Sequence, residues 1–137
     1  LPLKSTTPDR RDELWRHTCC EVFFATDEGP DYWECNFSPS GDWSVYRFSA
    51  YREDMDNPPL VGQPGILVER EPGRLTLRVT LDSGALGGAF PPDGSVRLAL
   101  SAVIETREGA LSYWALRHPP GKPDFHHPDG FALRLPA

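Results

Sequence analysis

Hydrophobic and polar positions alternate along several short segments of the chain, and turn-forming residues separate these segments. In 74–81, for example, every second residue is Leu or Val, and the residues between them are Thr or Arg. A period of two is typical of a β-strand with one buried and one exposed face. No stretch shows a sustained helical pattern, and 15 prolines with 12 glycines leave little room for one. Eight segments are predicted to be strands: 18–25, 32–38, 43–52, 66–71, 74–81, 95–107, 110–118 and 131–137.

The alternation also predicts which side chains of the later strands are buried. In 95–107, the face expected to be buried consists of Val96, Leu98, Leu100, Ala102 and Ile104. The opposite face, expected to meet solvent, consists of Arg97, Ala99, Ser101, Val103 and Glu105. In 131–137, the face expected to be buried consists of Phe131, Leu133 and Leu135.

Turn and loop signals set the connections between the predicted strands. The dipeptides Pro72-Gly73 and Glu108-Gly109 stand between alternating segments and are typical of hairpin turns. The polar stretches 1–13, 53–65 and 82–94 are predicted to be irregular. Strands at this spacing predict an all-β chain, folded as one antiparallel domain over residues 1–137, either a β-sandwich or a closed barrel.

The composition fits one globular domain and argues against two classes of partner. Hydrophobic residues make up 39% of the 137 positions and charged residues 25%, and domains cluster at about 100–150 residues. The 14 basic and 20 acidic residues give a net charge of −6, and the basic ones are spread singly. Such a surface repels phosphate backbones, so no nucleic-acid partner is expected. No apolar run approaches the ~20 residues that span a bilayer, so we expect a soluble chain without a membrane partner.

The three cysteines, Cys19, Cys20 and Cys35, are too few for a secreted disulfide scaffold, and their number is odd. On an extended segment, Cys19 and Cys20 point to opposite faces, so they make a poor chelating pair. We therefore expect three reduced thiols, most of them in the core, and a reducing compartment such as the cytoplasm.

Aromatic residues occupy both faces of two predicted strands, 32–38 and 43–52. A sandwich core uses one face of each strand, so some of these rings are expected at the surface, where a flat ring can stack on a sugar. The alternative is that the inner rings form the core and the outer rings cover a subunit contact or a neighbouring loop. The aromatic residues are Tyr32, Trp33, Phe37, Trp43, Tyr46, Phe48 and Tyr51, with Tyr113 and Trp114 on a later strand.

Two parts of the sequence resemble a known family. "DELWRHTCCEVFF" followed by "YWECNFSPSGDWSVYRFSAYR" is similar to the first hairpin of the DOMON-like domains, which are related to the family 9 carbohydrate-binding modules. The closing "SYWALRHPPGKPDFHHPDGF" resembles the end of a bacterial DOMON-like subgroup. The resemblance covers most of residues 12–135. The residues that match the pattern of the first hairpin are Trp15, Glu21, Val22, Phe23, Glu34, Asn36, Ser38, Pro39, Gly41 and Trp43.

The resemblance implies a jelly-roll-like β-sandwich that binds a small ligand, a sugar or a haem, and performs no chemistry unaided. It also implies one or two further strands before the Trp-led strand, and this sequence starts too late to include them, so a longer chain or another subunit would complete that edge. Carbohydrate is the first ligand we expect. The candidate stacking residues are Trp33, Trp43 and Trp114, and the candidate polar partners are Glu34, Asn36, Arg47 and His126.

Haem b, in a domain that transfers electrons, is the main alternative. Haem-binding relatives pair Met with His; Met55 is the single methionine, and His118, His126 and His127 lie within "HPPGKPDFHHPDGF" (118–131). Zinc is a weaker alternative, because the histidine spacing matches no standard finger and a third ligand would be needed. A third alternative is an interaction or assembly domain without a small ligand, which would form a homo-oligomer.

Motifs for catalysis or nucleotide binding are absent from the sequence, so the chain is not expected to be an enzyme. Glu21 and Glu34 stand mid-strand on neighbouring predicted strands and could approach each other, which would raise one pKa or attract a cation. The simpler expectation is that each pairs with an arginine such as Arg47 or faces solvent. Four prolines stiffen 118–131, and a rigid loop is a good wall for a ligand site.

Overall fold

The described residues form eight strands, as the sequence predicts. The structure is a computed structural model that describes residues 9–60, 62–86 and 95–136. The ends of the strands differ from the predicted ends by a few residues. The strands are β1 (Cys19–Thr26), β2 (Tyr32–Phe37), β3 (Trp43–Phe48), β4 (Gly65–Glu71), β5 (Arg74–Thr80), β6 (Val96–Glu105), β7 (Leu111–Ala115) and β8 (Leu133–Leu135). Short 3-10 helices lie at η1 (Leu14–Arg16), η2 (Ser83–Leu86) and η3 (Pro128–Gly130).

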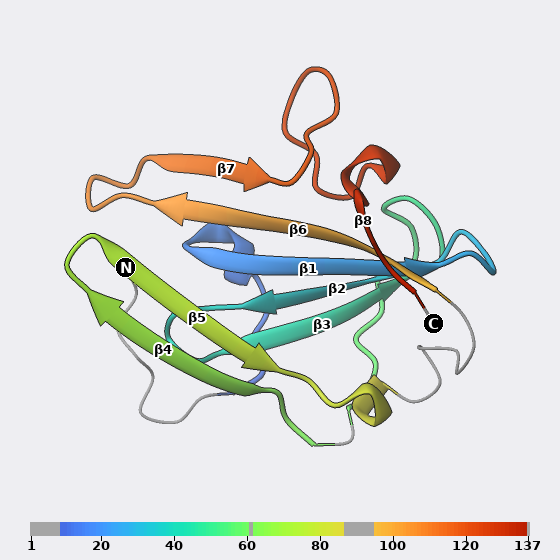
Figure 1. Cartoon of the computed structure of the whole chain (residues 1–137), viewed down its shortest axis with the longest axis horizontal. Helices are drawn as coiled ribbons and strands as arrows, with labels where there is room; N and C mark the ends of the chain where they lie inside the picture. The colour runs from blue at the N-terminus through green and yellow to red at the C-terminus, as the bar shows by residue number, and fades with distance from the viewer. Residues whose placement is uncertain (1–8, 61, 87–94, 137) are drawn as a thin grey trace.

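The strands form two antiparallel sheets, so the predicted β-sandwich is confirmed (Figure 1). The main sheet has the order β3-β2-β1-β6-β7, and β8 pairs with the first part of β6. The second sheet is the β4–β5 hairpin, which turns at Gly73 with a φ of 73°. A positive φ favours glycine, which explains why the predicted turn carries one.

One face of the main sheet is covered by the β4–β5 hairpin and is called the hairpin face. Its core includes Phe24 and Val45, which are 2% and 0% exposed. Ile66, Leu77 and Val79 of the hairpin pack against this core, so the predicted inward face of β5 is confirmed. Removing a Phe or Val side chain from water stabilises the fold by about 1.5–3 kcal/mol.

The opposite face of the main sheet is covered by residues 118–131 and is called the loop face; this segment is called the histidine loop. Phe23 and Phe48 are buried on the loop face, and Phe125 and Phe131 of the histidine loop pack against the cluster to which they belong. The loop lies against the sheet along one side, with β8 following it (Figure 1). A segment remote in sequence thus closes over strands β1 to β3.

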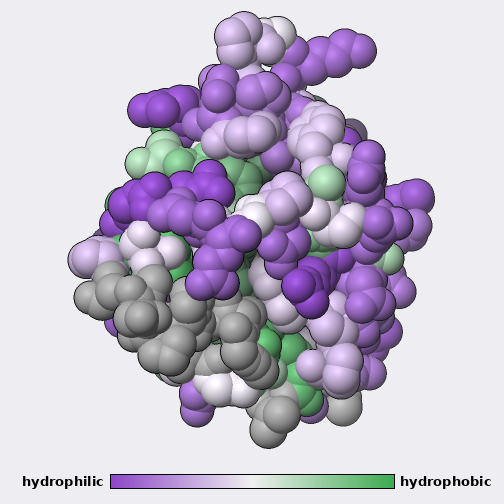
Figure 2. Space-filling model, turned by 90° about the vertical axis from the view of Figure 1, so that its right-hand side faces the viewer, coloured by the Kyte–Doolittle hydropathy of each residue, from purple (hydrophilic) through white to green (hydrophobic). Residues whose placement is uncertain are grey.

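The predictions about buried faces are wrong in part. On β6, Val96 is buried in the hairpin-face core and Leu98 packs against it, as predicted. However, Ala99 and Val103 of the face expected to be wet are 4% and 1% exposed, whereas Leu100 is 36% exposed. In 131–137, Phe131 packs against the loop-face core as predicted, but Leu133 and Leu135 are exposed. The hairpin-face core thus reaches the first part of β6, while Ala99 belongs to the buried cluster of the loop face. Figure 2 shows hydrophobic side chains at the surface among a hydrophilic majority.

The three thiols are free, and Cys19 and Cys35 are buried while Cys20 is half-buried, as the sequence predicts. Burial raises the pKa of Cys35 to about 12 and raises that of Cys19 further, so both thiols keep their protons. Within residues 9–60, 62–86 and 95–136, no helix has the length and apolar character needed to cross a membrane.

Candidate ligand-binding site

A cavity of about 430 Å³ lies on the loop face, beneath the histidine loop. Ligand pockets in proteins have volumes of about 300–1,000 Å³ and combine apolar walls with a few polar groups. The cavity has this character, because η1, β7 and the histidine loop supply rings while β1 and β2 supply carboxyl groups. Its lining residues are Trp15, Glu21, Glu34, Phe48, Arg52, Met55, Val103, Tyr113, Pro123, Phe125 and His126.

An ion pair between Glu34 and His126 joins the sheet to the histidine loop. The Glu34 Oε1 atom lies 3.1 Å from His126 Nε2, and the two side chains are 4% and 14% exposed. The other carboxyl oxygen, Oε2, accepts a hydrogen bond of 2.7 Å from Asn36 Nδ2. Both oxygens of Glu34 are therefore occupied, which is the condition under which a buried charge is tolerated.

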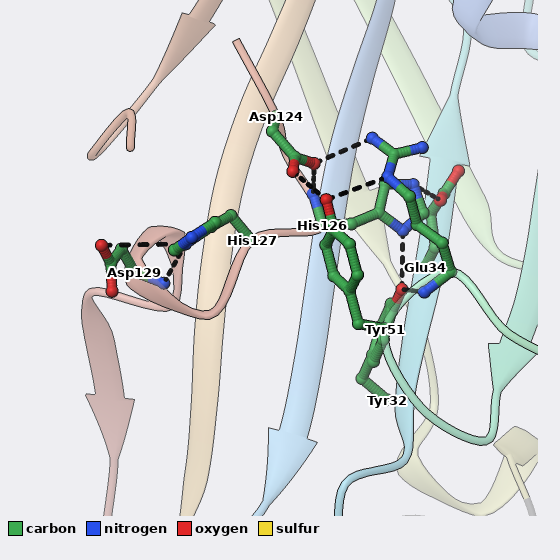
Figure 3. A network of polar contacts seen from close by, with 8 residues as sticks. Tyr32, Glu34, Tyr51, Asp124, His126, His127 and Asp129 are labelled. Atoms are coloured by element: carbon green, nitrogen blue, oxygen red, sulfur yellow. Dashed lines mark hydrogen bonds and ion pairs between the residues drawn. The ribbon is translucent and has the colours of Figure 1, made fainter. Parts of the chain in front are cut away.

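The second nitrogen of the His126 ring is occupied as well (Figure 3). His126 Nδ1 lies 2.7 Å from the Tyr32 hydroxyl, whose oxygen accepts a hydrogen bond of 3.0 Å from the Arg52 backbone N–H. Each ring nitrogen therefore has an oxygen partner within hydrogen-bond distance. The rings of Phe23 and Phe48 pack edge-on against the imidazole and hold it where it lines the cavity.

Asp124 fastens the histidine loop to the segment after β3. It accepts hydrogen bonds from the Tyr51 hydroxyl, from Arg52 Nη2 at 2.8 Å and from the His126 backbone N–H at 3.1 Å. Burial opposes ionisation of Asp124, yet the hydrogen bonds from Tyr51 and Arg52 hold its pKa below the usual value. The loop is therefore held in place by a charged carboxylate, as well as stiffened by its prolines.

Glu21 differs from Glu34 because one of its carboxyl oxygens has no partner in the described part of the chain. The residue is 4% exposed, and its Oε2 atom is buried without a hydrogen-bond partner among the described residues. Burial, and then the negative charge of Glu34, raise the pKa of Glu21 to about 8. The simpler expectation from the sequence, that each glutamate pairs with an arginine or faces solvent, is therefore wrong for both. Sheet register places them diagonally on β1 and β2, under the loop.

A row of polar side chains crosses the main sheet through Glu21. Register places Ser44 on β3 opposite Asn36, Asn36 opposite Glu21, and Glu21 opposite Ser101 on β6. Among the described residues of this row, Glu21 Oε2, Asn36 Oδ1 and Ser101 Oγ are buried without a hydrogen-bond partner. Each such atom costs about 1–3 kcal/mol. Of these three residues, Glu21 lines the cavity, so its carboxyl group is the one that a bound ligand could reach.

Four of the residues predicted to bind a ligand are placed together by the structure. Glu34 and His126 line the cavity and contact each other. Asn36 supports Glu34 from the same strand. Met55, the candidate haem ligand, also lines the cavity, with half of its surface exposed. The loop face thus combines polar residues from both predicted ligand sets.

The other candidates for sugar binding lie on the hairpin face, away from the cavity. Register pairs Trp33 with Phe24, and Trp43, with 5% exposure, belongs to the hairpin-face core. Arg47 lies over the Trp33 ring and pairs with Asp31. Trp114 is opposite Ala102 on β6 and is 63% exposed. The predicted set is therefore divided between two faces of one sheet.

The histidines of the loop do not converge. His118 stacks on the Phe125 ring at 6.2 Å between centroids, and His127 accepts a hydrogen bond from the Asp129 backbone N–H at the start of η3. The described part of the chain holds no cluster of three metal-binding side chains. His118 and His127 thus shape the loop, while His126 reaches the cavity.

Sequence reasoning missed several lining residues, chiefly Trp15, Arg52, Tyr113 and Phe125 as members of one site. Tyr113 was recoverable in principle, because alternation puts it on the face opposite to Trp114. The cavity lies on the face of the main sheet that the histidine loop covers. The local sequence pattern does not predict which face that is. Protein-family models, curated protein sequences and solved structures contain no match to the chain.

Proposed function

We propose that the chain is a non-catalytic carbohydrate-binding module of the DOMON-like type, and that the sugar binds in the cavity beneath the histidine loop. The observation that supports this most strongly is the combination of aromatic rings and buried hydrogen-bonding groups around one cavity of about 430 Å³. The proposal moves the expected site from the outer tryptophans to the loop face.

The chemistry of the lining suits a sugar. Rings such as Trp15 and Tyr113 offer flat apolar surfaces to the C–H faces of a pyranose, and their own polar atoms can remain solvated. Glu21, which has a buried oxygen without a partner among the described residues, offers a hydrogen-bonding group to a sugar hydroxyl. Glu34 has both oxygens engaged by Asn36 and His126, so it is poorly placed to act as a base or nucleophile. This supports binding without catalysis.

Haem is the alternative ligand, and Met55 and His126 do line the same cavity. However, the two ring nitrogens of His126 are engaged by Tyr32 and Glu34. An axial ligand must offer a free nitrogen lone pair to iron. The residues as they stand do not fit a haem, because Tyr32 or Glu34 would have to give up its contact first. The geometry therefore favours the sugar.

Two neighbouring residues of β7 give a matched test. Tyr113 lines the cavity beside Phe125, and Trp114 points to the opposite face; both side chains are exposed, so neither belongs to the buried core. Binding of glucose, galactose, xylose and N-acetylglucosamine to wild type, Tyr113→Ala and Trp114→Ala is measured by calorimetry. We expect at least one sugar to bind, Tyr113→Ala to weaken it about tenfold through loss of a stacking surface, and Trp114→Ala to bind as wild type does.

The opposite outcome, with affinity lost in Trp114→Ala and kept in Tyr113→Ala, would show that the sugar binds on the outer face and not in the cavity. If no sugar of the panel binds, and the Soret band of haem b shifts on addition of the protein relative to free haem b, the haem alternative would replace the sugar proposal.

A further inference from the structure

Resting on the proposed function, we propose that the Glu21 carboxyl is a neutral hydrogen-bond donor to a ligand hydroxyl, so that the cavity accepts uncharged sugars and rejects sugar acids. We infer this from three features of the site: the isolation of the Glu21 carboxyl, the pairing of Arg52 and His126 with other acids, and the hydrogen-bonding capacity of a sugar hydroxyl.

The isolation of Glu21 is the first feature. Its carboxyl group faces the cavity from β1, is 4% exposed, and has an oxygen without a partner among the described residues. An ionised carboxylate in such a place would lack both solvation and a counter-charge, which costs several kcal/mol. A protonated carboxyl avoids this cost and turns one oxygen into a donor.

The pairing of Arg52 and His126 with other acids is the second feature. Arg52 is paired with Asp124 at 2.8 Å, and His126 is paired with Glu34 at 3.1 Å, so neither is free to neutralise Glu21. Glu34 itself disfavours a second negative charge beside it. Together these surroundings keep the pKa of Glu21 near 8, first through burial and then through Glu34. The titratable and charged groups around Glu21 on its own strand and on the elements packed against it are Cys19, Cys20, Glu34, Tyr46 with Asp12, Arg52, Tyr113 and His126.

The hydrogen-bonding capacity of a sugar hydroxyl is the third feature. A sugar hydroxyl can accept the hydrogen bond that a protonated Glu21 donates. A carboxylate on the ligand could also accept from Glu21, but it would lie beside Glu34, while Arg52 and His126 are already paired with other acids. The site should therefore discriminate by charge, in favour of neutral hydroxyl groups.

Matched ligand pairs and a pH series test the inference. Calorimetry measures the binding of glucose and glucuronate, and of galactose and galacturonate, to wild type at about one pH unit below and one unit above the Glu21 pKa of about 8. The neutral sugars should bind about tenfold more weakly at the higher pH, since loss of the Glu21 proton removes the donor. The acids should bind at least tenfold more weakly than their neutral partners at the lower pH.

The Glu21→Gln variant supplies the control, because its amide is a neutral donor at every pH. It should bind the neutral sugars with the same affinity at both pH values. Equal wild-type affinity at both pH values, or sugar acids that bind as well as neutral sugars, would overturn the inference while leaving the sugar proposal intact. Absence of binding by any neutral sugar at either pH would instead overturn the proposed function. The wild-type series decides the question even where the variant fails to fold.

Discussion

The two faces of the main sheet are built from the same strands, yet they differ in what covers them and in what they contain. The hairpin face is covered by two further strands, and its buried cluster is formed by apolar or aromatic side chains such as Phe24 and Val45. The loop face is covered by an irregular, proline-rich segment, and it buries Glu21, Glu34 and Asn36 beneath that cover.

The difference shows that the segment packed against a sheet face determines which side chains can be buried there. A pleated hairpin matches the sheet row by row, so apolar side chains interdigitate and leave no room for polar groups. The histidine loop makes contact at selected points, chiefly through Phe125, His126 and Asp124, and leaves a cavity between them. Both faces bury aromatic side chains, but the loop face also holds buried polar groups beside a cavity.

Of the variants that test this comparison, Phe24→Ala on the hairpin face is expected to lower the free energy of unfolding most. Removing a buried phenyl ring costs about 3–5 kcal/mol of unfolding free energy, through lost burial and the cavity left behind. Urea unfolding of wild type and variant measures the difference. Leu67→Ala, on the outer side of the hairpin with 63% exposure, should change stability by less than about 0.5 kcal/mol. Similar losses in both variants would show that the hairpin is not seated on Phe24.

A smaller loss is expected from Glu34→Gln on the loop face. The variant keeps the shape of the side chain but removes the charge that faces His126 and accepts from Asn36, and hydrogen bonds to charged groups contribute about 1.5–3 kcal/mol. Unfolding at neutral pH gives the value, and Lys122→Ala in the exposed part of the same loop is the control. An unchanged stability would mean that the Glu34–His126 contact does not fasten the loop.

The smallest effect, taken per pH unit, is expected from Glu21. Folding raises its pKa from 4.5 to about 8, so between these values the unfolded chain has lost a proton that the folded chain keeps. The contribution of Glu21 to stability is therefore complete below 4.5 and falls by about 1.4 kcal/mol per pH unit up to about 8. Glu21→Gln should lack this slope in urea unfolding across the same range. Parallel curves for both proteins would contradict a buried neutral carboxyl.

The strands could be predicted from the sequence because their information is local. Alternation in 74–81 and the Gly73 turn identify the β4–β5 hairpin with its inward face, and register follows from them. The same reasoning fails on β6, because the exposure of Leu100 depends on how far the hairpin extends across the sheet. The sequence pattern of β6 does not show how far the β4–β5 hairpin extends over it.

The candidate site could be predicted only in part, for the same reason. Glu34 and His126 were recognisable as polar residues in conspicuous segments, but their contact spans 92 positions and depends on the loop returning to β2. The exposed Trp114 is prominent in the sequence, whereas the neighbouring Tyr113 lines the cavity. Aromatic content indicates that rings are available to a ligand; the tertiary fold selects which of them surround a cavity.

The β4–β5 ribbon has one further consequence. Among the described strands, β4 and β5 pair only with each other, so they adhere to the main sheet through side chains and not through shared backbone hydrogen bonds. Their amide protons can reach solvent when the ribbon alone lifts away, whereas those of β1 and β6 are released only when the central sheet comes apart. The β4–β5 hairpin can thus open by itself while the main sheet and the cavity beneath the histidine loop stay folded.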